Sequence, residues 1–159
     1  MAINLGRVIA GGLAAGAVRI LGEVAVRAIF ADSMRAQLIK LNPALLAAAL
    51  GAAAIVEGVT IQLCFGIAVV FIYAAMRPRF GAGPGTAIRA GLTLWSVASL
   101  AYLNMAVAGI FSWGFQIARV SATLVPTLIA AYVGALLYKE AESATRAEPR
   151  AGYSPATTA

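Results

Sequence analysis

The 159-residue sequence contains no histidine, a single cysteine and few charged residues. Without histidine, His-ligated haem and the usual zinc and di-iron sites are excluded. The lone Cys64 lies within an apolar segment, so no internal disulfide bond can form, and we interpret Cys64 as a small buried apolar residue. The sequence shows neither a nucleophile–base pair nor metal-ligand spacing. We therefore expect no enzymatic activity and no cofactor.

Charged residues make up only 11% of the chain, against about 25% in a soluble domain. Hydrophobic residues make up 62%, and the mean hydropathy is +0.89. This composition is typical of a multi-pass membrane protein. A net charge of +6 would also suit a nucleic-acid partner, but no basic helix face is interleaved with aromatic residues. Because the basic residues gather at the ends of apolar segments, we expect the lipid bilayer as the partner and no nucleic acid.

Four apolar segments predict membrane-spanning helices over about residues 5–30, 43–76, 87–111 and 115–138. The second helix would be about 50 Å long, which exceeds a hydrocarbon core of about 30 Å, so it must tilt, kink or project into water. Residues 32–41 predict a helical extension or an interfacial segment. Thr86 suits the start of the third helix, and Pro126 predicts a kink in the fourth.

The predicted fold is all-α: residues 1–139 form an integral membrane four-helix bundle, and residues 140–159 form a disordered cytoplasmic tail. The positive-inside rule then compares the basic residues at the two ends of the bundle. Seven would be cytoplasmic: Arg7, Arg77, Arg79, Arg89, Lys139, Arg146 and Arg150. Three would lie outside: Arg35, Lys40 and Arg119. This asymmetry predicts cytoplasmic termini, and we expect the inner membrane of a bacterium.

Charged residues interrupt the first apolar segment. Arg19, Glu23 and Arg27 recur every four residues, so they fall within about 80° of one another on one helix face. Gly12 and Gly16 lie on the same face and would let a neighbouring backbone approach closely. An Arg at mid-bilayer costs roughly 2.5–3.5 kcal/mol, so this face must meet a partner or water rather than lipid.

The second helix offers a carboxylate at a similar depth. If the first helix is centred near Val18, Arg19 lies about 1.5 Å and Glu23 about 7.5 Å toward the outer surface. If the second is centred near Thr60, Glu57 lies about 5 Å toward the same surface. The sequence therefore predicts an intramembrane network with no net charge, formed by Arg19, Glu23, Arg27 and Glu57, with Asn104 of the third helix as a polar neighbour.

Gln62 lies about 140° around the second helix from Glu57. We expect Gln62 to hydrogen-bond to another helix or subunit, and to serve helix packing together with Gly12 and Gly16.

The predicted network admits two interpretations. In the first, buried ion pairs fix helix register and assembly in a non-enzymatic structural or accessory protein. In the second, a small oligomeric transporter or channel for an ion, proton or small anion uses these groups, with a water-filled vestibule reaching Glu57. Candidate partners are a second copy of the chain or another membrane protein.

Three parts of the sequence resemble a group of small, uncharacterised bacterial four-helix membrane proteins. They are GRVIAGGLAAGAV with LGE (residues 6–18 and 21–23), YAAMRPRFGAGPGTAIRAGL (73–92) and GALLYKE (134–140). The most specific part is the basic loop YAAMRPRFGAGPG, and Glu23 matches a glutamate of the family's first helix. The family usually has an acidic residue in the fourth helix where this chain reads TLVPT. The resemblance implies the four-helix topology and no assigned activity.

Overall fold

The computed structural model of the chain describes the backbone of residues 3–147 and the side chains of residues 3–138. Residues 3–147 form helices and turns without a β-strand, which confirms the all-α class. The helices are α1 (Leu5–Ile29), α2 (Ala31–Leu41), α3 (Pro43–Leu50), α4 (Ala52–Phe80), α5 (Pro84–Val107), α6 (Trp113–Ala122) and α7 (Leu124–Ala147).

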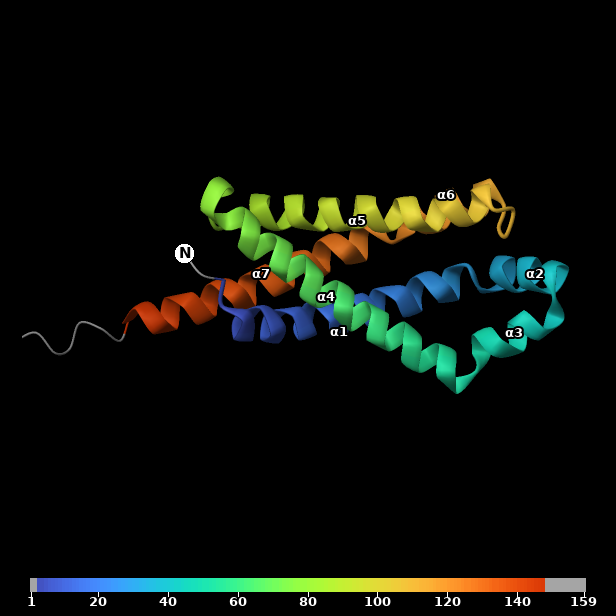
Figure 1. The fold of residues 1–159 in the computed structure, drawn as a ribbon, viewed down its shortest axis with the longest axis horizontal. Helices are drawn as coiled ribbons and strands as arrows, with labels where there is room; N and C mark the ends of the chain where they lie inside the picture. The colour runs from blue at the N-terminus through green and yellow to red at the C-terminus, as the bar shows by residue number, and fades with distance from the viewer. Residues whose placement is uncertain (1–2, 148–159) are drawn as a thin grey trace, which may run out of the picture.

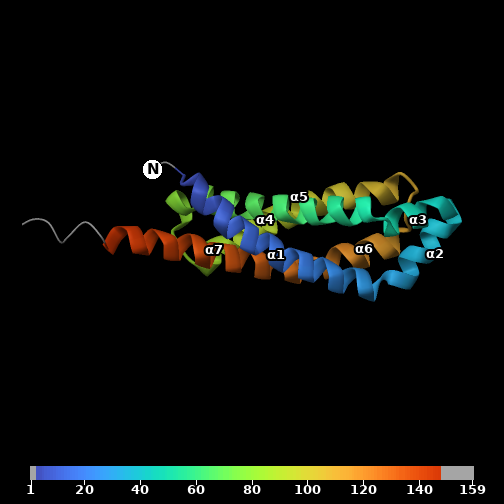
Figure 2. The same ribbon diagram turned by 90° about the horizontal axis from the view of Figure 1, so that it is seen from below.

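Four stretches are long and apolar enough to cross a membrane: α1, α4, α5, and α6 with the first part of α7. The N-terminal end of α1, the α4–α5 turn and the end of α7 lie at one end of the bundle (Figure 1). The α2–α3 hairpin and the α5–α6 turn lie at the other. Helix α1 packs against α4 and α7, and α5 packs against the same two helices. Figure 2 shows α1 running obliquely between α7 and the α4–α5 pair. The chain is thus a multi-pass membrane bundle.

The predicted second helix is two helices. Asn42 accepts a hydrogen bond from Ala44 N at 2.9 Å and starts α3, as its N-cap pattern suggests. At Gly51 the backbone becomes extended (φ −69°, ψ 157°) and α4 begins one residue later. Glycine is a poor helix former, so the over-long segment bends there. The predicted end at 76 is wrong: α4 continues to Phe80 and stops at Gly81, whose φ of 78° favours glycine.

The third helix, α5, starts earlier than predicted, with Pro84 in its first turn, and ends at Val107. Thr86 does not cap it. The buried Thr86 hydroxyl instead donates to Gly81 O at 2.8 Å, satisfying a carbonyl at the end of α4. Thr86 therefore stabilises the α4–α5 turn.

The fourth span bends as Pro126 predicts. α6 ends at Ala122, and Pro126 is the third residue of α7, where its missing N–H costs little. The proline ring packs closely on Gly22 of α1. The predicted disordered tail is wrong for residues 140–147, which continue α7, because this alanine- and glutamate-rich stretch favours helix. The rest of that prediction, residues 148–159, lies outside the described residues.

The α1–α4 contact is built on glycine. A Cβ on Gly12 would lie 2.5 Å from Ile67 Cα, and one on Gly16 would lie 2.8 Å from Leu63 Cα. Gly66 of α4 faces the backbone of Gly12 and Gly16 in return. The predicted packing roles of Gly12 and Gly16 are confirmed, since no larger side chain fits without moving a helix. This close approach fixes which face of α4 meets the charged face of α1.

Candidate functional site

Arg19 joins three of the spans. Its Nε donates to Gln62 Oε1 on α4 at 2.8 Å, and its Nη1 donates to Thr127 Oγ1 on α7 at 2.6 Å. The Thr127 hydroxyl in turn donates to Thr123 O at 2.7 Å, so it acts as both donor and acceptor. The Arg19 guanidinium also lies 5.0 Å from the centroid of the Phe65 ring. The expected interhelical bond of Gln62 is therefore confirmed, with Arg19 as its partner.

Glu23 forms ion pairs with two arginines. Its Oε1 accepts from Arg119 Nη2 of α6 at 2.7 Å, and about a tenth of each of these side chains is exposed (11% and 12%). The same oxygen accepts from Arg27 Nε, one helical turn along α1, at 3.2 Å, where the Arg27 side chain is 46% exposed. Arg119 also lies 5.0 Å from the centroid of the Tyr102 ring. We call Arg19, Glu23, Arg27, Gln62, Arg119 and Thr127 the polar cluster.

Glu57 does not belong to the polar cluster, and its prediction was wrong. Its side chain is exposed, and it has no hydrogen-bond or ion-pair partner among residues 3–138. Two physical reasons account for this. α4 spans residues 52–80, so its midpoint is Gly66 and Glu57 lies about 13.5 Å from that midpoint. Glu57 is also about 140° around α4 from Gln62, the residue that faces α1.

Asn104, the predicted polar neighbour, also lies outside the polar cluster. Its side chain is exposed on α5, and its backbone carbonyl accepts from Ala108 N at 3.0 Å. Cys64, expected to be buried, is exposed as well, because it lies about 200° from Gln62 around α4. Both residues face away from the bundle interior.

Sequence reasoning missed Arg119 and Thr127 as members of the polar cluster. Arg119 was counted as a surface charge of the outer loop, on a helix expected to start at 115. The span starts at Trp113, so Arg119 lies about 9 Å inside it. That depth inside an apolar span, where an arginine needs a carboxylate partner, is the signal that could have identified Arg119. Thr127 carries no such signal, since threonine is common in membrane helices.

With Arg119 present and Glu57 absent, the polar cluster is not neutral. It contains three guanidinium groups and one carboxylate, a formal charge of +2. The predicted neutral network is therefore not found: Glu23 pairs with Arg27 and Arg119, and Arg19 bonds to Gln62 and Thr127 instead.

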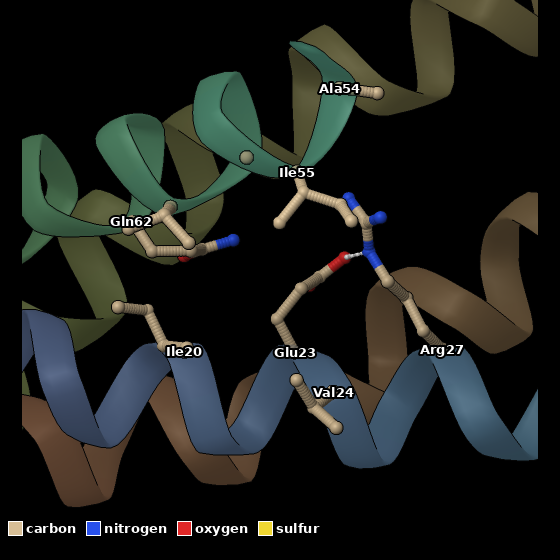
Figure 3. Close-up of a pocket in the computed structure, with 9 residues that line it drawn as sticks. Ile20, Glu23, Val24, Arg27, Ala54, Ile55 and Gln62 are labelled. Atoms are coloured by element: carbon tan, nitrogen blue, oxygen red, sulfur yellow. Dashed lines mark hydrogen bonds and ion pairs between the residues drawn. The ribbon is translucent and has the colours of Figure 1, made fainter. Parts of the chain in front are cut away.

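Two cavities meet at Glu23. One, of about 280 Å³, opens between α1 and α4, and Figure 3 shows Glu23 and Arg27 projecting into it from α1, facing Ile55 and Gln62 of α4. The other, of about 10 Å³, lies between α1, α5 and α7 and is bounded by Arg19, Glu23 and Tyr102. This inner chamber has room for about one water molecule. Glu23 thus borders both spaces.

Within residues 3–138, no group of three or more Cys, Asp or Glu side chains is placed to hold a metal ion. Comparisons with protein-family models, curated proteins and solved structures found no match. A function for this chain therefore has to be inferred from the geometry of the polar cluster.

Proposed function

We propose that this chain is a non-enzymatic integral membrane protein, structural or accessory, in which the polar cluster locks three of the four spans together: α1, α4 and the span formed by α6 and α7. The observation that carries the proposal is the position of Arg19, whose guanidinium donates to Gln62 on α4 and Thr127 on α7. A side chain bonded to both neighbouring spans stabilises one register of the bundle. Removing it would leave two polar partners without a donor in a low-dielectric region.

The ion pair between Glu23 and Arg119 supports the same role. It joins the outer half of α1 to α6, which also bonds to α5, where Trp95 Nε1 donates to Val120 O at 3.1 Å and Gln116 Nε2 donates to Tyr102 O at 2.7 Å. An unpaired arginine at this depth would be costly, so Glu23 lets Arg119 lie within the span.

The experiment replaces the pair by neutral residues. For a structural role, the double variant Glu23→Gln/Arg119→Gln should keep a folded bundle, because an amide pair can hydrogen-bond without burying charge. Proteoliposomes containing either protein should pass protons and small anions no faster than empty vesicles. Flux that the wild-type chain supports and the double variant lacks would contradict this proposal.

A small transporter or channel for a proton, ion or small anion is the second candidate. The observation that favours it is that Glu23 borders both the α1–α4 cavity and the inner chamber. A carboxylate reached from two sides can pass a proton between them.

Proton flux tests the second candidate. In vesicles loaded with a pH-sensitive dye, Glu23→Gln should abolish the flux, because an amide cannot exchange a proton. The matched control is Glu57→Gln, a carboxylate outside the polar cluster, which should leave the flux unchanged. Equal loss in both variants would exclude a path through Glu23.

We further propose cytoplasmic termini and a bacterial inner membrane. With Arg119 inside the polar cluster, the basic residues counted at the α2–α3 end fall to Arg35 and Lys40, which strengthens the charge asymmetry. A partner chain, either a second copy or another membrane protein, would pack on the apolar outer faces. Chemical crosslinking in native membranes tests for one.

A further inference from the structure

The cavity between α1 and α4 is a crevice lined by both aliphatic and polar side chains. The two helices meet at Gly12, Gly16 and Gly66 and diverge toward the α2–α3 end (Figure 1). Most of the side chains that line the crevice are aliphatic, Ile20, Val24, Ile55 and Val59 among them. The polar ones are Glu23, Arg27 and Gln62. An aliphatic crevice with an arginine on its wall suits a molecule that is apolar over most of its length.

Depth along the crevice places Arg27 at its outer end. The midpoint of α1 is Ala17, so Ile20 lies about 4.5 Å from the bilayer centre and Arg27 about 15 Å. Half of a hydrocarbon core is also about 15 Å. Arg27 is therefore at the level where acyl chains give way to headgroups, and the aliphatic lining runs inward from it.

Arg27 is the cation of the polar cluster whose charge is least neutralised by Glu23. Glu23 pairs at 2.7 Å with Arg119 and at 3.2 Å with Arg27, whose side chain remains 46% exposed. The polar cluster holds an excess charge of +2, and Glu57 does not line the crevice. An anion beside Arg27 would offset part of this excess, and a guanidinium is suited to binding phosphate.

We propose that the α1–α4 crevice is a binding site for an anionic phospholipid, with its phosphate on Arg27 and an acyl chain between Ile20 and Val59. The occupant is a lipid of the surrounding leaflet rather than a free anion, because most of the wall inward of Arg27 is aliphatic, Glu23 and Gln62 excepted, and a small anion would leave that part empty. Lipid binding goes beyond the structural role of the polar cluster, and requires no transport.

Gly58 makes the site testable without changing charge. A Cβ on Gly58 would lie 3.5 Å from Arg27 Nη2, so the space over this glycine is where the guanidinium rests. Gly58→Leu would fill the crevice while keeping Arg27. Ile55 lines the same crevice and is 59% exposed, so Ile55→Trp is a second filling variant that leaves the core intact.

The experiment titrates the full chain in mild detergent with phosphatidylglycerol, with phosphatidylcholine of the same acyl chains, and with inorganic phosphate. Native mass spectrometry counts the retained lipid. The wild-type chain should retain one phosphatidylglycerol in preference to phosphatidylcholine and should bind no inorganic phosphate. Arg27→Gln should weaken phosphatidylglycerol binding about tenfold, since a charge-assisted contact to phosphate is lost. Both filling variants should lose the retained lipid.

Arg35→Gln is the matched control, because Arg35 is an exposed cation on α2 that does not line the crevice. It should bind phosphatidylglycerol as the wild type does. Equal retention of the two lipids by the wild type, or undiminished phosphatidylglycerol binding by Arg27→Gln and by a filling variant that folds, would overturn the proposal. Binding of inorganic phosphate that displaces the lipid would overturn it in favour of a solute site.

Discussion

Arg119 Nη2 lies 2.7 Å from Glu23 Oε1, an ion pair between residues 96 positions apart in the chain. It connects α1 with α6, and Glu23 extends it to Arg27 on the next turn of α1. Arg119 would otherwise place an unpaired charge inside the fourth span. This ion pair and the edge-to-face contact of Phe30, at the end of α1, with Phe115 therefore join α1 to α6.

Arg119→Met should destabilise the bundle. It leaves Glu23 with only the half-exposed Arg27, and loss of one bonding partner by a partly buried polar group costs about 1–3 kcal/mol. Thermal unfolding in detergent measures the change. The double variant Glu23→Gln/Arg119→Gln is the control and should lose less than Arg119→Met. A larger loss in the double variant would contradict the pairing.

Arg19 and Gln62 should show coupled stabilities. Arg19→Met and Gln62→Leu each break the 2.8 Å bond, and interhelical hydrogen bonds in membranes contribute about 0.6 kcal/mol, rising to about 1.7. A double-mutant cycle of unfolding free energies should return a coupling in that range. Arg19→Met combined with Glu57→Gln is the matched cycle, and it should return none, because Glu57 does not contact Arg19.

Gly66→Ala should weaken the α1–α4 contact. The new methyl group would meet the backbone of Gly12 and Gly16, and overpacking of this kind costs about 1–3 kcal/mol. Gly114→Ala is the control, since a Cβ at Gly114 would meet nothing within 4 Å. Its unfolding midpoint should stay unchanged or rise slightly. If both variants unfold alike, the close approach at Gly66 is not what holds α1 to α4.

Glu57→Gln should leave the unfolding midpoint of the bundle unchanged. The side chain is exposed and has no partner among residues 3–138, so neutralising it removes no contact. Glu23→Gln, measured beside it, should lower the midpoint because it weakens the bonds to both Arg119 and Arg27. Destabilisation by Glu57→Gln comparable to that by Glu23→Gln would restore the network predicted from sequence.

Much of the candidate site could be predicted from the sequence. The four-residue spacing places Arg19, Glu23 and Arg27 on one face of α1, and the same spacing puts Gly12 and Gly16 beside them. Hydrophobic runs predict the spans, because membrane insertion depends on length and apolarity. The partners of the charged residues were harder to predict. Glu57 and Gln62 lie five residues apart on different sides of α4, and the sequence does not say which side faces α1.

By itself the sequence determined the all-α class, the four spans and the charged face of α1, because each follows from periodicity within one segment. Only the tertiary structure decided that Gln62, Thr127 and Arg119 meet that face and that Glu57 does not. The reason is the glycine contact between Gly12, Gly16 and Gly66, which sets the rotation and depth of α4. The start of α6 at Trp113 likewise sets the depth of Arg119. The glycine contact is a relation between two helices, and no single segment contains it.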